Sequence, residues 1–210
     1  MHTEKIRLDD RLEETVSCDV ALKEWSATCL ALAEGRQILL LRKGGIHDDV
    51  GAFQLEQSQF WLQPTYIHQG DYLVKPEWQD VLQRANASQQ PDENEKFIVL
   101  RHFARVEHIW QMTPDRTEAE RLETLRRARH MWSDDYLQLR LDFKPQHPLL
   151  CVALRVWTCE ETTLPMRSEF LGCRSWIDLP QPLTPQNARA ALDDDAFASQ
   201  MEELRAVFES

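Results

Sequence analysis

The sequence predicts an α+β fold: a mixed, mostly antiparallel sheet or small barrel, with helices before it, inserted in it and after it. Three observations lead to this prediction. The apolar run 38–41 is continuous, which is typical of a strand buried on both faces. Two longer segments, 97–112 and 149–158, have the composition of strands. Helix-capping signals and helical periodicity lie between those segments and toward both ends of the chain.

Length and composition indicate an ordinary globular protein. The chain has 210 residues, of which 42% are apolar and 28% are charged, so one domain with a sizeable core is expected. The formal net charge is −11, which disfavours a general duplex-binding protein. The charge is uneven, however, because the middle segment 36–180 holds 18 Lys and Arg against 21 Asp and Glu. A local basic face is therefore compatible with the sequence.

We expect three parts along the chain: an acidic N-terminal arm (1–18), a single α+β domain (19–180) and an acidic C-terminal helical extension (181–210). The charged first residues contain no signal-peptide pattern, and no apolar run is long enough for a membrane span. The five cysteines form no CxxC pair. These features favour reduced thiols and a cytoplasmic location, without a membrane partner.

In the first half of the chain, Asp19 is placed to cap an amphipathic helix, and Gly35 supplies the left-handed residue that ends it. The apolar residues that share one face of this helix are Ala21, Trp25, Cys29 and Leu32. Residues 36–42 follow as a buried strand. Short extended pieces are expected around 53–55 and 60–62, with Pro64 ending the second, and Pro76 then opens a helix. The polar segment 87–95 predicts a loop.

In the second half, 97–112 predicts a strand with an irregularity near Ala104. Thr117 and Glu120 form a capping box at the start of a helical insertion, 116–143, in which Ser133 can cap a second helix. Residues 149–158 predict the second core strand, and 171–179 a last one. Helices are expected to begin at Thr184–Pro185 and at the acidic run 193–195.

The residues with the most chemical potential lie between 42 and 69. Arg42 and Lys43 end the buried strand, and Gly44 and Gly45 follow, so positive charge and exposed amides can face a phosphate or carboxylate. The alternative is a tight turn with solvated basic residues. The corner has no Walker or dinucleotide-binding spacing. We place Thr65 and Gln69 in the same ligand pocket.

Glu56 and His68 are candidates for general acid–base catalysis, since a carboxylate beside an imidazole is the minimum for that chemistry. No third residue completes a metal site by its spacing, and a structural role for His68 is the alternative. The remaining candidate ligand contacts come from the second half of the chain. They are Arg101, His102, Arg140 and Trp176, the last as a platform for a base. Core packing is the alternative for the tryptophan. No cofactor is indicated.

The segments RKGGI and FQLEQSQFWLQPTYIHQ resemble the bacterial, largely cyanobacterial, family called domain of unknown function 1802. The resemblance runs from the ALKEW segment at 21–25 to the GCRSW segment at 172–176. It implies no activity or cofactor. More loosely, the order of elements in the second half resembles PUA-like barrels of the ASCH and EVE kinds. That likeness implies binding of RNA or modified bases.

The sequence therefore supports three functions. The first is recognition of a nucleic acid or nucleotide-like anion by a pocket built on 42–69. The second is hydrolysis, of a nucleic acid or of another substrate, by Glu56 and His68 with or without a metal. The third is binding of a protein partner through the acidic terminal helices.

Overall fold

The computed structural model describes residues 16–43, 57–66, 70–88, 96–171 and 175–210. Within them one mixed sheet runs in the order β2-β5-β4-β3-β1-β6. β7 also pairs with β5, further along that strand than the residues that pair with β2. Only β1 and β3 are parallel; the other named strand pairs are antiparallel. The strands are β1 (Cys18–Trp25), β2 (Leu39–Lys43), β3 (Gln59–Thr65), β4 (Phe97–Met112), β5 (Leu149–Pro165), β6 (Trp176–Leu183) and β7 (Arg189–Ala190). The predicted α+β class is confirmed.

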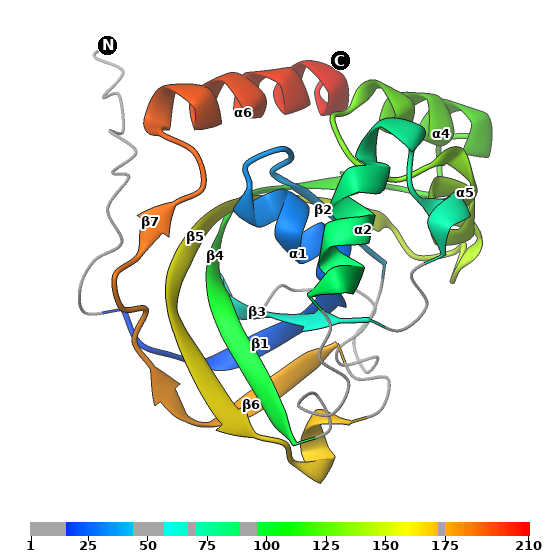
Figure 1. Cartoon of the computed structure of the whole chain (residues 1–210). Helices are drawn as coiled ribbons and strands as arrows, with labels where there is room; N and C mark the ends of the chain where they lie inside the picture. The colour runs from blue at the N-terminus through cyan, green and yellow to red at the C-terminus, as the bar shows by residue number, and fades with distance from the viewer. Residues whose placement is uncertain (1–15, 44–56, 67–69, 89–95, 172–174) are drawn as a thin grey trace.

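The sheet curls until its two ends approach each other (Figure 1). β6 lies at one edge, but the chain that follows it returns to β5 near the other edge. There the Glu160 amide donates to the Gln186 carbonyl at 2.8 Å, and the Ala191 amide donates to the Val156 carbonyl at 2.9 Å. These bonds, together with β7, explain why a predicted helix at Thr184 is wrong. The backbone groups of that segment bond to β5 instead of to one another.

The N-terminal helix begins later than its periodicity predicts. Residues 18–25 form β1, and α1 (Ser26–Ala33) is the only helical part of that segment. β1 is held between β3 on one side and β6 on the other, so its backbone is satisfied by the sheet. The prediction that α1 is amphipathic is also wrong, because six of its eight residues are buried. A helix that is buried nearly all round belongs inside a fold. Gly35 ends α1 as predicted, with φ +64.

The helices pack in and around the curve of the sheet (Figure 1). The described helices of more than one turn are α1, α2 (Gln79–Ala87), α4 (Glu118–Arg127), α5 (Asp134–Asp142) and α6 (Asp194–Phe208). Short 3₁₀ turns are η1 (Asp71–Leu73), η2 (Pro76–Trp78) and η3 (Ser168–Phe170). Pro76 opens η2, which leads directly into α2, close to the predicted helix start.

The helical insertion between the two long strands is confirmed. The Thr117–Glu120 capping box is formed at the start of α4, and the Ser133 hydroxyl accepts from the Tyr136 amide at the start of α5. β4 has the predicted bounds, with register shifts on both sides of Ala104. β5 runs further than predicted, to Pro165. The Asp193 carboxylate caps α6, as its sequence indicates.

The largest buried cluster joins α1, α2, α5 and α6 to β2 and to the first residues of β5. This cluster fixes the end of β2, where Arg42 and Lys43 lie, against the helices. The candidate site is therefore built on a packed part of the molecule.

Candidate anion-binding site

The ends of β1, β2 and β3 meet at Glu24. Arg42 Nη1 lies 3.0 Å from Glu24 Oε2, and only 11% and 6% of the two side chains are exposed. The other carboxylate oxygen, Glu24 Oε1, accepts from the Trp25 amide at 2.8 Å. The Thr65 hydroxyl donates to the Glu24 carbonyl at 3.1 Å. Thr65 pairs with Trp25 in the parallel register, so the sheet itself aligns these groups.

Lys43 lies on the opposite side of β2 from Arg42, as consecutive residues of a strand do. The residue is buried, and its Nζ donates to the Leu141 carbonyl of α5 at 2.5 Å. Burial lowers the pKa of Lys43, and the nearby positive charges of Arg121 and Arg140 lower it further. Lys43 therefore points into a region that is already rich in cations.

Arg121 and Arg140 supply hydrogen-bond donors that the described residues do not use. Arg121 on α4 is 6% exposed, and its Nε and Nη1 have no partner among the described residues. The same holds for Nε of Arg140, near the end of α5. Buried donors in proteins almost always have partners, so these are exceptions to account for. We call Arg42, Lys43, Arg121 and Arg140 the cationic cluster.

Tyr136 lies near two members of the cationic cluster, Arg42 on β2 and Arg140 on α5. The guanidinium carbon of Arg140 lies 5.5 Å from the centre of its ring. Burial raises the pKa of Tyr136 to about 12, against the charges of Arg140 and Arg42, which lower it, while Glu24 raises it. Its ring packs against Trp25 at 4.9 Å and against Trp132 at 5.3 Å. The hydroxyl of Tyr136 is thus fixed near both arginines by aromatic packing.

Two carboxylates lie near the cluster but are held by a neutral side chain. Gln138 Nε2 donates to Glu118 Oε1 at 2.6 Å and to Asp142 Oδ1 at 3.0 Å. Both carboxylates are close enough to Lys43 that their charges raise its pKa. The cationic side chains of β2, α4 and α5 therefore have two carboxylates nearby, and both of these carboxylates accept hydrogen bonds from Gln138.

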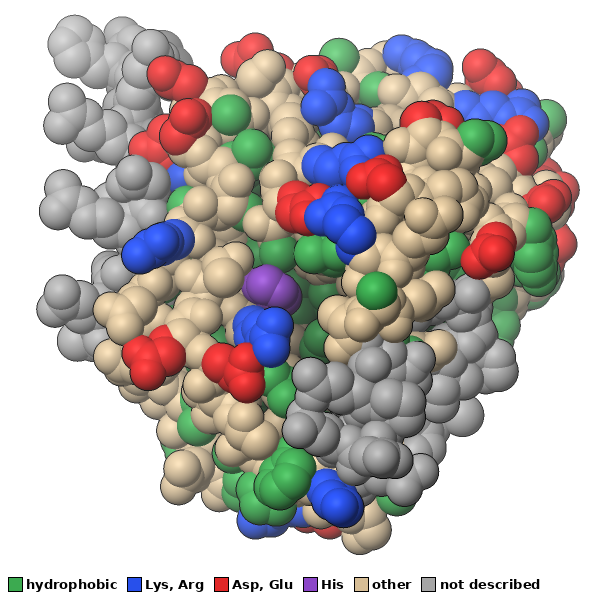
Figure 2. Space-filling view, in the orientation of Figure 1, with side chains coloured by type: hydrophobic (Ala, Val, Ile, Leu, Met, Phe, Trp, Pro, Cys, Tyr) green, Lys and Arg blue, Asp and Glu red, His purple; other side chains and the backbone are tan. Residues whose placement is uncertain are grey.

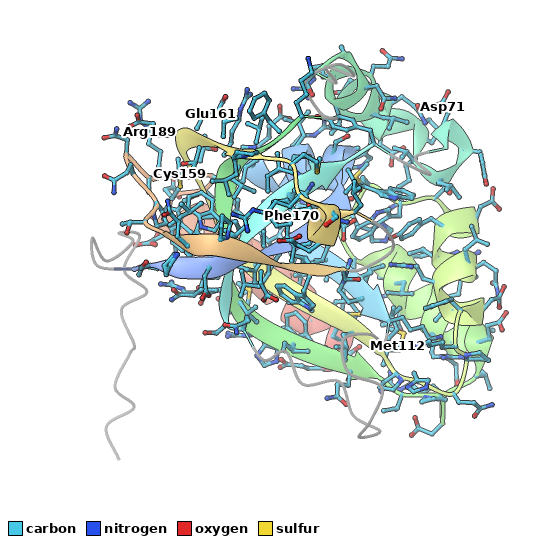
Figure 3. All side chains as sticks on the ribbon, turned by 90° about the horizontal axis from the view of Figure 1, so that it is seen from below. Asp71, Met112, Cys159, Glu161, Phe170 and Arg189 are labelled. Carbon is cyan, nitrogen blue, oxygen red and sulfur yellow. The ribbon has the colours of Figure 1, made fainter. Side chains whose placement is uncertain are left out.

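Three of the predicted ligand residues lie apart from the cluster. Arg101 pairs with Glu161 at 2.6 Å on the exposed surface. Figure 3 shows Glu161 at the opposite end of the long β4–β5 pair from Met112, which leads into α4 and α5. His102 lies in mid-strand, where burial first and the charge of Arg101 second lower its pKa to about 4. Trp176 packs edge-to-face on Phe60 at 4.9 Å.

Five predicted site residues lie outside the described residues: Gly44, Gly45, Glu56, His68 and Gln69. The proposed Glu56–His68 pair therefore stays a prediction. Arg42, Lys43, Thr65 and Arg140 do come together, around Glu24 and α5.

Sequence reasoning did not select Glu24, Arg121 or Tyr136 as site residues. Glu24 lies in the ALKEW segment that carried the family resemblance, which was the one signal available for it. Arg121 lies in a charged helix, where an arginine side chain is expected to be exposed. Tyr136 and Arg140 are four residues apart on α5, a spacing that puts both side chains on one face.

In the described part of the chain, no group of three or more His, Cys, Asp and Glu is placed to hold a metal ion. Within the same residues, every helix is too short or too polar to cross a bilayer.

Fold and site together define an α+β protein with a curled mixed sheet and a partly buried cationic cluster. The chain belongs to the family described as Domain of unknown function (DUF1802), whose model matches residues 21–203. The comparisons with curated proteins and with solved structures gave no match. The likeness to PUA-like barrels therefore stays a prediction.

Proposed function

We propose that the protein binds a small phosphate-type oxoanion, free or as part of a nucleotide or phosphorylated metabolite, at the cationic cluster. One observation carries the proposal: the buried N–H groups of Arg121 and Arg140 have no partner among the described residues. Leaving a buried donor unpaired costs about 1–3 kcal/mol, and more when the group is charged. An anion that accepts these bonds removes that cost.

The arrangement of the donors favours a tetrahedral anion over a planar carboxylate. Lys43, Arg121 and Arg140 come from β2, α4 and α5, so their groups approach from three elements. A phosphate offers oxygens in several directions, whereas a carboxylate offers two in one plane. Guanidinium groups also match phosphate in geometry and charge.

The surface favours a small ligand over a nucleic acid. The whole chain carries −11, and exposed carboxylates at Glu118, Asp134, Asp135 and Asp142 border α4 and α5. Acidic and basic side chains are interspersed on the face in Figure 2, without an extended basic surface. Nucleic-acid binding depends on many phosphate contacts along such a surface.

Calorimetric titration in low salt tests the proposal with phosphate, sulfate, AMP and a short single-stranded RNA. We expect phosphate, sulfate and AMP to bind, and the RNA to bind no more tightly than AMP. Arg121→Gln and Arg140→Gln should each weaken phosphate binding by about tenfold or more, the loss of a charge-assisted hydrogen bond.

Arg127→Gln is the matched control, because Arg127 is an exposed arginine at the end of the same helix as Arg121. It should bind phosphate like the wild type. Circular dichroism and thermal melting establish that each variant is folded. A wild-type protein that binds none of the three small anions, or two folded arginine variants with unchanged affinity, contradicts the proposal.

A further inference from the structure

We infer that Gln138 is a positioning residue that holds two of the chain's own carboxylates away from Arg121 and Arg140, and so keeps the anion site open. This inference rests on the proposed function. It explains why arginines near two carboxylates have buried donors that no described residue pairs with.

The sequence spacing favours a different pairing from the one observed. Glu118 and Arg121 are three residues apart on α4, a separation at which a carboxylate and a guanidinium are neighbours and commonly pair. Instead, Glu118 Oε1 accepts from Gln138 Nε2 of α5 at 2.6 Å. Nε and Nη1 of Arg121 have no partner among the described residues.

Asp142 is held in the same way. It lies one helical turn after Gln138 and accepts from the same Nε2 at 3.0 Å. An amide nitrogen carries two hydrogens, so these two bonds use the full donor capacity of Nε2. One neutral group thus binds two like-charged carboxylates between α4 and α5. It adds no charge of its own to the cluster.

Release of these carboxylates would create internal competitors for the ligand. A group tethered within reach of a site acts at an effective concentration on the order of millimolar or more. Glu118 and Asp142 already lie close enough to affect the ammonium of Lys43. Without Gln138, we expect Glu118 to turn toward Arg121 and accept from Nε and Nη1, the donors that have no partner in the described part of the chain.

Phosphate titration of four proteins tests the inference: the wild type, Gln138→Leu, the pair Glu118→Gln with Asp142→Asn, and the three substitutions together. With both carboxylates present, Gln138→Leu should weaken phosphate binding by about tenfold, the effect of losing one charge-assisted contact. With both carboxylates neutralised, the same substitution should change affinity by less than about twofold, because no competitor is left.

A purely structural role for Gln138 predicts an equal loss of affinity in both backgrounds, and that result overturns the inference. Unchanged affinity in Gln138→Leu overturns it as well. Gln138→Ala repeats the test with a smaller side chain, and thermal melting checks folding throughout. If the wild type binds no phosphate, the proposed function fails, and this inference fails with it. If the wild type binds but the effects are uncoupled, only this inference fails.

Discussion

The charges of Arg42 and Arg140 both lower the pKa of Tyr136. The two arginines nevertheless differ in whether their guanidinium groups are available to a ligand. The guanidinium of Arg42 is committed to Glu24 in a buried ion pair. Removing one partner of such a pair typically costs about 3–5 kcal/mol, because the other charge is left buried. A substitution at Arg42 therefore changes stability and binding together. Arg121 and Arg140 have donors that no described residue accepts from, so substitutions there report on binding more directly.

His130 makes stability depend on pH. Its Nε2 lies 2.8 Å from the Leu125 carbonyl, and its Nδ1 accepts from the Trp132 amide at 3.2 Å, an arrangement that requires the neutral ring. Burial, followed by the charge of Lys75, lowers its pKa to about 4. The unfolded value is about 6.5, so this contribution is complete above pH 6.5 and is lost as pH falls toward 4.

Between pH 7.5 and 5 the His130 contribution should fall by about 2 kcal/mol. Urea unfolding of the wild type and of His130→Gln measures it, because glutamine does not titrate. The difference in unfolding free energy between the two proteins should shrink by that amount over the interval. Parallel pH profiles for the two proteins would show that His130 does not titrate as described.

Among individual residues, charged side chains at element ends were predictable and their partners were not. Arg42, Lys43 and Arg140 follow from local chemistry, because a strand end and a helix end place polar groups at the border of the core. Glu24 did not follow, since the predicted helix would have placed it away from the apolar face. β1 and β2 do not pair with each other, and the curl of the sheet brings Glu24 to Arg42, eighteen residues later. Local sequence carries no sign of that contact.

At the scale of elements, capping chemistry was predictable because it is local. The Thr117–Glu120 box and the caps at Ser133 and Asp193 each depend on residues within three positions. The start of α1 was not predictable in that way. Its preceding eight residues fit helical spacing, but β3 and β6 bond to both of their edges. Tertiary pairing then overrides periodicity.

Gly35 gives a prediction for the end of α1. Its φ is +64, and an added Cβ would lie 2.5 Å from Leu192 Cδ2 and 2.9 Å from the Ala191 carbonyl. Gly35→Ala should therefore lower the unfolding free energy by about 2 kcal/mol or more, from backbone strain and crowding together. Urea unfolding at neutral pH measures the change.

Gly70→Ala is the matched control. The three atoms nearest to its new Cβ would be ring atoms of Tyr72, a side chain that is 66% exposed and free to turn away. We expect a change within about 0.5 kcal/mol. Equal losses in the two variants would contradict the role given to the left-handed conformation of Gly35.

At the scale of the whole molecule, the apolar side chains of α6 are part of the main hydrophobic core. Phe197, Met201 and Leu204 belong to the largest buried cluster, together with α1, α2 and β2. Two polar contacts add to this packing: Arg155 Nη2 lies 2.5 Å from Asp194 Oδ1, and Gln200 Nε2 donates to the Gly35 carbonyl at 2.8 Å. The sequence predicted a helix with an apolar stripe here. It did not indicate which surface that stripe covers.

Removal of α6 should therefore unfold the chain. Full burial of one large apolar side chain contributes about 1.5–3 kcal/mol, so the helix supplies a large part of a total stability of about 5–15 kcal/mol. We expect a chain ending at Leu192 to lose cooperative thermal melting, followed by circular dichroism. Glu203→Gln, which removes only the exposed pair with Arg129, should melt like the wild type. If the truncated chain melts cooperatively at the wild-type temperature, α6 is an appendage whose apolar face is available to a partner. If it does not, a protein partner of α6 is restricted to the polar face.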